Sequence, residues 1–335
     1  MEMIDRSELY PLIFAPLYKE RLWGGSQLTS VLHRDVPAGK DPIGESWEIV
    51  DRDGAQSIVC NGPLAGTEIS QLVKHYGKNL LGGKFSGGRF PLLVKLIDAG
   101  QRLSLQVHPD EEACSRIGDG AEPKTEMWYI VAAQKDARIM AGMNPRSTKR
   151  QLLELLNSPE VESQLQVYKS QPGDAYFISS GIIHAIDAGN LLLEIQQNSD
   201  TTYRISDWGR VDSDGKPREL HVARGMESIN FTNRTSSRIP GVVGDVGHNR
   251  KFPVTNHCRF FSVDDLRLVG DWRDDTVQSG SFHLLSAINR PVRVGKDEKT
   301  VDLAPGQSCL VPACFGTYFI IPLESGVSDV LRTTI

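Results

Sequence analysis

Residues 102–109 read Arg-Leu-Ser-Leu-Gln-Val-His-Pro and set the pattern for much of the chain. Side chains alternate between the two faces of a β-strand, so the apolar residues here share one face and Ser104, Gln106 and His108 share the other. Pro109 cannot donate to a strand ladder and is expected to end the strand. The stretch therefore predicts a β-strand with one apolar and one polar face.

Short runs of this kind recur along the 335 residues and are bounded by Gly, Pro, Asn and Asp, as antiparallel sheets require. Apolar residues at helical spacing occur near 67–81 and 147–168, and the second stretch is broken near Ser158 and Pro159. We therefore predict a mainly β fold with a small helical insertion. The predicted strands include 56–60, 91–97, 127–133, 174–179, 190–197, 282–288 and 317–322.

The segment 233–251 is rich in Gly, Ser, Arg and Asn and has little periodicity, which indicates a connection between domains. We expect a catalytic domain over 1–240 and a second β-barrel-like domain over 250–335. Residues 171–179 and 304–312 align as a weak repeat, each with a Pro-Gly turn leading into an apolar strand. The first copy leads to His184 and the second to Thr317, so the second domain is expected to be free of metal.

The composition limits the classes of partner. A net charge of −5 without a basic run gives no electrostatic reason to expect nucleic acid or an anionic membrane. No apolar run approaches membrane-spanning length, and the N-terminus lacks the apolar core of a secretory signal. Five cysteines without paired spacing argue against a disulfide framework, so we expect a cytoplasmic protein. We also expect a monomer or homodimer.

Four side chains form a candidate metal site. Gln106 and His108 project the same way from one strand and can reach one ion. Glu126 begins an apolar strand, where a carboxylate is costly unless it is paired or bound to a cation. His184 lies in a glycine-led turn, and imidazole is a common ligand for Zn²⁺. Each residue also has a simpler explanation: a polar strand face, an ion pair between Lys124 and Glu126, or, for Gln106, a hydrogen bond to a true ligand.

Six stretches are informative together: LYKERLWGG (17–25), GESWEIVDR (44–52), FPLLVKLIDAGQRLSLQVHPDEE (90–112), PKTEMWYI (123–130), GIIHAI (181–186) and EIQQNSDTTYRISDWGR (194–210). By composition alone the polar tract over 194–210 would be a solvated loop. In combination, these stretches resemble the type I mannose-6-phosphate isomerases of the short bacterial form. The resemblance spans about residues 16–220, and only its QVHP and QQNSDTTYR motifs are distinctive singly.

The resemblance implies cupin-type jelly-roll barrels, one Zn²⁺ per chain and interconversion of mannose 6-phosphate and fructose 6-phosphate. It places the zinc ligands on the four residues named above and the catalytic arginine on Arg204. Glu194, Lys124 and Ser104 also match active-site positions. The larger eukaryotic forms carry an extra helical domain that this chain is too short to contain.

An aldose–ketose isomerase needs a base for carbon and a group that stabilises the enediolate oxygens. For the base we favour Glu194, with Lys124 as the rival. Arg204 is expected to stabilise negative charge or hold the phosphate, and Ser104 and Lys124 are further candidate phosphate contacts.

Two other functions fit parts of the pattern. Two histidines and one carboxylate also hold iron in non-haem oxygenases with a cupin fold. A non-catalytic homologue that only binds a sugar phosphate is the second alternative. Both stay open on the sequence alone.

Overall fold

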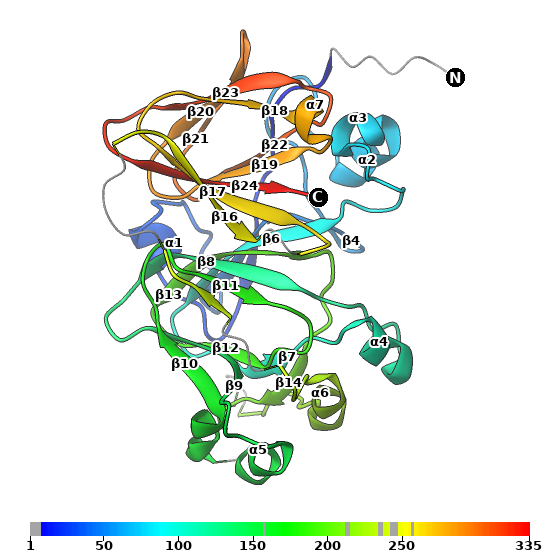
Figure 1. The fold of residues 1–335 in the computed structure, drawn as a ribbon, viewed down its shortest axis with the longest axis vertical. Helices are drawn as coiled ribbons and strands as arrows, with labels where there is room; N and C mark the ends of the chain where they lie inside the picture. The colour runs from blue at the N-terminus through cyan, green and yellow to red at the C-terminus, as the bar shows by residue number, and fades with distance from the viewer. Residues whose placement is uncertain (1–7, 157, 212–214, 234–236, 242–246, 256–257) are drawn as a thin grey trace. The chain divides into compact units, whose positions relative to one another are not determined.

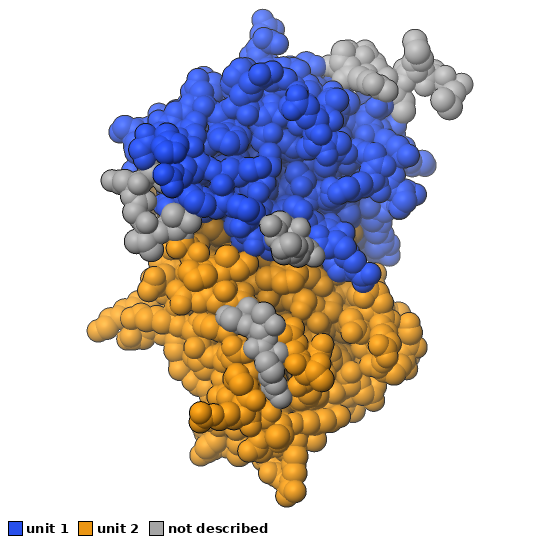
Figure 2. Space-filling model, viewed as in Figure 1, with its two compact units in different colours: residues 1–17, 47–92, 243–335 blue, residues 18–46, 93–242 orange. Residues whose placement is uncertain are grey.

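The computed structural model describes residues 8–156, 158–211, 215–233, 237–241, 247–255 and 258–335. Strands make up 40% of the chain and helices 15%, so the predicted mainly β class is confirmed. The chain forms two compact units, coloured separately in Figure 2. Unit 1 contains residues 1–17, 47–92 and 243–335, and unit 2 contains residues 18–46 and 93–242.

Unit 2 is built on a seven-stranded and a five-stranded sheet (Figure 1). The seven-stranded sheet has the order β15 (Arg238–Ile239), β11 (Ala175–Ile178), β8 (Glu126–Ala133), β13 (Asn190–Gln197), β6 (Leu92–Ala99), β3 (Ile43–Ile49) and β2 (Leu17–Glu20). The five-stranded sheet has the order β10 (Leu165–Lys169), β9 (Arg138–Met143), β12 (His184–Ile186), β7 (Leu105–Val107) and β14 (Tyr203–Ser206). The short helices of this unit are α1 (Gln27–Ser30), α4 (Glu111–Ile117), α5 (Lys149–Leu155), the 3₁₀ helix η2 (Pro159–Gln164) and α6 (Val222–Ser228).

The alternation in β7 decides which way its side chains face. Leu105 and Val107 are buried in a cluster with Leu152 of α5 and Met226 of α6. These helices lie on the side of the five-stranded sheet away from β8 and β11 (Figure 1). Because neighbouring residues of a strand point to opposite faces, Gln106 is directed toward the space between the two sheets. The core between the sheets includes Trp128, Ile130, Tyr176, Ile139, Ala141 and Ile186.

Unit 1 contains a six-stranded, a four-stranded and a two-stranded sheet around an apolar core of Leu, Val and aromatic residues. The six-stranded order is β1 (Leu12–Ile13), β22 (Ser308–Val311), β19 (His283–Ala287), β24 (Ser328–Thr334), β17 (Ser262–Leu268) and β16 (Arg250–Thr255). The four-stranded order is β18 (Trp272–Asp275), β23 (Thr317–Pro322), β20 (Val292–Lys296) and β21 (Lys299–Leu303), and β4 (Asp51–Arg52) pairs with β5 (Ala55–Gln56). The helices are α2 (Ile69–Tyr76), α3 (Lys78–Leu81) and α7 (Thr276–Ser279).

Two features differ from the sequence predictions. Segments 1–17 and 47–92 belong to the same unit as the C-terminal part of the chain. One cause is the pairing of β1 with β22, two strands that are nearly three hundred residues apart in the sequence, so that no local pattern predicts it. The helical stretch expected over 147–168 has the expected break, because α5 ends at Leu155 and Pro159 starts a 3₁₀ turn, but its last part is wrong: residues 165–169 form a strand paired with β9. The stretch over 67–81 is helical and is divided into α2 and α3 at Gly77. Of the expected interdomain connection, residues 234–236 and 242–246 lie outside the described residues.

A buried histidine in unit 1 is held by neutral partners. Nδ1 of His283 lies 2.7 Å from the Tyr318 hydroxyl, and Nε2 lies 2.8 Å from the Ser279 hydroxyl. Burial lowers the pKa of His283 to about 4, although Asp274 opposes the shift. His283 is therefore uncharged in the folded protein at neutral pH.

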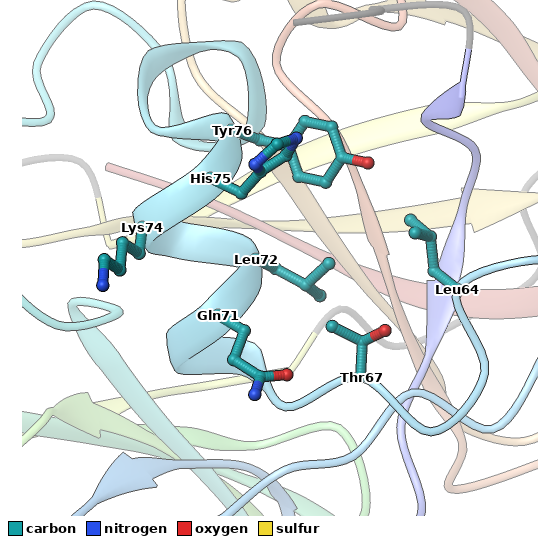
Figure 3. Close-up of a pocket in the computed structure, with 7 residues that line it drawn as sticks. All are labelled: Leu64, Thr67, Gln71, Leu72, Lys74, His75 and Tyr76. Carbon is teal, nitrogen blue, oxygen red and sulfur yellow. The ribbon is translucent and has the colours of Figure 1, made fainter.

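A cavity of about 520 Å³ lies beside α2 and is lined by Leu64, Thr67, Gln71, Leu72, Lys74, His75 and Tyr76 (Figure 3). Its lining contains no carboxylate, and Lys74 points away from Leu64.

No helix among the described residues has the length and apolar composition needed to span a bilayer.

Candidate active site

Three neighbouring strands of the five-stranded sheet bring the predicted polar residues together. Gln106 on β7 lies opposite His184 on β12 and, on its other side, opposite Arg204 on β14. His108 follows β7 directly, and its carbonyl accepts a hydrogen bond from the Gly181 amide. Gly181 has φ +86°, a conformation that glycine adopts without steric cost. The turn leading to His184 is thus tied to the strand that carries His108.

Both imidazoles are oriented by backbone carbonyls. His108 Nδ1 donates to Thr201 O at 2.9 Å, and His184 Nδ1 donates to Ile182 O at 2.8 Å. With the proton on Nδ1, each neutral ring keeps a lone pair on Nε2, the arrangement seen in metal-binding histidines.

Both Nε2 atoms face the carboxylate of Glu126, which begins β8 in the opposite sheet. His108 Nε2 lies 3.3 Å from Glu126 Oε2, and His184 Nε2 lies 3.5 Å from Glu126 Oε1. Ligand atoms on a tetrahedron with bonds of about 2.1 Å are about 3.4 Å apart. Among the described residues, these three form the one group of His, Cys, Asp and Glu side chains placed to hold a metal ion.

The chemical state of the three residues also fits a cation. His108 Nε2 and Glu126 Oε1 are buried and have no hydrogen-bond partner among the described residues, whereas Glu126 Oε2 lies 3.0 Å from the Lys124 ammonium. Burial and the Lys124 ammonium lower the pKa of His108 to about 4, and burial also lowers the pKa of His184. Burial raises the pKa of Glu126, but the Lys124 ammonium outweighs it and holds this pKa well below its usual range. At neutral pH the site therefore contains two neutral imidazoles and one carboxylate, the forms that bind metal.

Gln106 and Ser104 extend this group. The Gln106 amide nitrogen donates to His184 Nε2 at 3.2 Å, and Ser104 Oγ donates to Gln106 Oε1 at 3.2 Å. The two ends of an amide are nearly isosteric, so a 180° rotation directs the oxygen toward the imidazole nitrogens instead. The position of Gln106 allows it to act as a ligand or as a hydrogen-bond partner.

A second group of buried charges adjoins the triad. Lys124 Nζ lies 3.0 Å from Glu126 Oε2 and 3.9 Å from Glu194 Oε1. Glu194 also lies 3.3 Å from Lys95 Nζ and accepts a hydrogen bond from Trp128 Nε1 at 2.9 Å. Burial lowers the pKa of Lys124, but Glu126 and Glu194 raise it above its usual value. Two lysines and an indole thus fix the carboxylate of Glu194 beside the triad.

Five of the eight predicted site residues line one cavity of about 430 Å³, a volume typical of small-molecule sites, whereas the buried triad of His108, Glu126 and His184 is not part of its lining. Ser104, Gln106, Lys124, Glu194 and Arg204 all line it. The other lining residues are Arg21, Trp23, Glu45, Lys95, Ile97, Leu103, Ile186, Asp200, Thr202 and Arg218.

Five charged residues line this cavity without having been predicted as site residues: Arg21, Glu45, Lys95, Asp200 and Arg218. Lys95 lies within the run Phe90–Ala99, where the whole of β6 is buried. A lysine inside such a strand must be paired, and that signal was available. Arg218 follows a polar turn and carries no comparable signal.

Comparison with known proteins identifies the family. The sequence model of the phosphomannose isomerase type I catalytic domain matches residues 12–125. The mannose-6-phosphate isomerase ManA of Bacillus subtilis is 36% identical over 312 residues, which cover 92% of this chain and 95% of that protein. This chain belongs to the type I phosphomannose isomerase family.

Other type I phosphomannose isomerase relatives agree in sequence and structure. The mannose-6-phosphate isomerase of Streptococcus mutans is 34% identical and covers 90% of this chain and 92% of its own. The crystal structure of the Bacillus subtilis mannose 6-phosphate isomerase superposes with a TM-score of 0.83 at 30% identity, covering 98% of this chain and all of that one. Phosphomannose isomerase of Salmonella typhimurium shares the fold at 15% identity, with a TM-score of 0.77. The resemblance, the cupin-type fold and the assignment to an isomerase family are confirmed.

Proposed function

We propose that this chain is a zinc-dependent isomerase that interconverts mannose 6-phosphate and fructose 6-phosphate through an enediolate. The observation that carries the proposal is the buried triad of His108, Glu126 and His184 in metal-binding protonation states, next to Glu194 in the same unit. Family membership supplies the substrate, because the relatives are named for it.

One zinc ion per chain would be held by the triad, with Gln106 as the fourth ligand. With two imidazoles, a carboxylate and an amide as protein ligands, substrate would bind as a fifth ligand, a coordination number that catalytic zinc can reach. When bound, zinc would act as a Lewis acid that polarises the sugar carbonyl.

Glu194 is the proposed base that moves the proton between C1 and C2. Its carboxylate is almost fully buried, which excludes competing water, and Lys95, Lys124 and Trp128 hold it in one orientation. Lys124, the rival base, has a raised pKa and is protonated at neutral pH. In that state it is suited to donate to the sugar oxygens, although a nearby divalent ion would lower this pKa because like charges repel.

Arg204 and Ser104 are the proposed substrate contacts on β14 and just before β7. Arg204 lines the cavity and carries a permanent positive charge, which suits either the developing enediolate or the phosphate. Ser104 is held by Gln106, so its hydroxyl stays near the metal end of the cavity.

Two alternatives remain for the experiment to reject. The triad alone also matches a non-haem iron oxygenase, but the Lys95–Glu194–Lys124 group has no role in oxygen chemistry. A homologue that binds sugar phosphate without turnover would need no buried base. We further propose a cytoplasmic location, supported by five unpaired cysteines, and action as a monomer or homodimer.

The test is conversion of mannose 6-phosphate by the purified protein, with fructose 6-phosphate measured by a coupled assay and dissolved oxygen followed in parallel. We expect isomerisation without oxygen consumption. Oxygen uptake with substrate would indicate an oxygenase, and tight substrate binding without turnover would indicate a binding protein.

A further inference from the structure

Arg218 lines the same cavity as Arg204 and is held in place by a buried carboxylate. Its Nε and Nη2 donate to the two oxygens of Asp207 at 2.8 and 2.5 Å. Asp207 is 6% exposed and also accepts from Arg210 at 2.5 Å. Arg210 in turn donates to the carbonyl of Arg102, which anchors this turn to the segment that precedes β7. The bidentate pair fixes the plane of the Arg218 guanidinium at the cavity wall.

Positive charge is in excess at this end of the cavity. Asp207 pairs with Arg210 and Arg218, and Arg204 is close enough to be affected by their charges. The side chain of Glu219 is 83% exposed, and Arg204 donates to its carbonyl. Burial and the nearby Arg218 lower the pKa of Arg204, because two guanidinium groups of like charge repel each other. An anion between them would relieve this repulsion.

Both guanidinium groups retain unused donors. Nε of Arg204 is buried and has no hydrogen-bond partner among the described residues. Nη1 of Arg218 donates to no described residue, since its two bonds to Asp207 use Nε and Nη2. Lys124, by contrast, is occupied by Glu126 and Glu194 at the metal end.

We propose that Arg218, together with Arg204, binds the phosphate group of the substrate, and that Asp207 positions Arg218 for this contact. The inference rests on the proposed function for the identity of the substrate. It assigns the phosphate to the arginine end of the cavity and leaves the sugar carbon atoms beside Glu194 and the triad. A fixed guanidinium fork matches the geometry of a phosphate dianion.

The test compares the metal-loaded wild-type protein with Arg218→Gln and Arg218→Lys. Calorimetry measures the binding of inorganic phosphate, mannose 6-phosphate and unphosphorylated mannose, and steady-state assays give KM and kcat. Arg293→Gln is the matched control, because Arg293 forms the same bidentate pair with Asp302 at an exposed site in unit 1.

We expect Arg218→Gln to raise Kd and KM for mannose 6-phosphate about 10- to 100-fold and to weaken phosphate binding similarly. Mannose binding and metal content should not change, kcat should fall less than KM rises, and Arg218→Lys should recover part of the affinity. Unchanged phosphate and mannose 6-phosphate affinity in Arg218→Gln would overturn the inference, as would an equal loss of mannose binding. If the wild-type protein binds mannose 6-phosphate without converting it, and Arg218→Gln weakens that binding, the role of Arg218 is supported and the proposed isomerase function is rejected.

Discussion

Replacing Glu126 by glutamine should abolish stable metal binding, because Glu126 is the single anion in the proposed ligand set. Loss of a group that only supports a metal ligand typically costs 10- to 100-fold in affinity, so loss of the anionic ligand should cost at least about 100-fold. At zinc equal to 100 times the wild-type Kd, wild-type protein gains about 2.7 kcal/mol of stability, whereas the variant gains about 0.4 kcal/mol.

The metal-free variant should also be less stable than the metal-free wild type. In the variant, Lys124 Nζ loses the ion pair that it forms with Glu126 Oε2 at 3.0 Å. Glu194, whose Oε1 lies 3.9 Å from Lys124 Nζ, is then the nearest carboxylate that can partly compensate the buried ammonium. Breaking a buried ion pair typically costs 3–5 kcal/mol, and the second carboxylate favours the lower end, about 3 kcal/mol. The double variant Glu126→Gln with Lys124→Met should recover this stability without recovering metal binding.

Thermal unfolding with and without zinc, together with metal analysis of the purified proteins, measures both effects. Glu162→Gln is the control, because Glu162 pairs with two arginines and takes no part in the triad. A Glu126→Gln protein that keeps one metal per chain and the full zinc-induced shift would refute the assignment of this ligand.

Three further predictions concern other groups of the structure. Arg204→Ala should lower kcat/KM for mannose 6-phosphate at least about 100-fold with metal content intact, because it removes a charged phosphate contact; a near-normal kcat/KM would remove Arg204 from the site. Trp128→Phe deletes the 2.9 Å hydrogen bond to Glu194 and should lower kcat about tenfold or more at unchanged metal content, whereas an unchanged kcat would show that the indole does not orient the base. Because the pKa of His283 is about 4 when folded and about 6.5 when unfolded, the unfolded chain binds the extra proton between these values. Stability should therefore be lost as pH falls from 6.5 to 4, by up to about 3 kcal/mol, and His283→Gln should show a flatter pH dependence in chemical unfolding; an equally steep dependence would contradict this.

Local patterns of the sequence were enough to select several residues of the candidate site. Alternation placed Gln106 and His108 on one face, and the cost of an unpaired carboxylate marked Glu126 as a residue with a partner. The structure brings these residues and His184 within reach of one another, although the register that aligns Gln106 with His184 depends on strand pairing, which the sequence does not state.

The failures of prediction also have physical causes. The apolar spacing of residues 165–168 resembles that of a helix, but these residues belong to β10, which pairs with β9 and buries Leu165. Segment 47–92 belongs with the C-terminal unit because of long-range contacts that leave no local pattern. Lys95 was passed over as part of an apolar run, although its burial required the carboxylate of Glu194 nearby.

The central claim is that a metal ion held by His108, Glu126 and His184 is required for isomerisation of mannose 6-phosphate. The most direct measurement is isomerase activity and metal content of one preparation before chelation, after chelation and after zinc is restored. We predict that activity follows metal content, disappears when the metal is removed and returns at one zinc per chain. Full activity in protein shown to be free of metal would contradict the account.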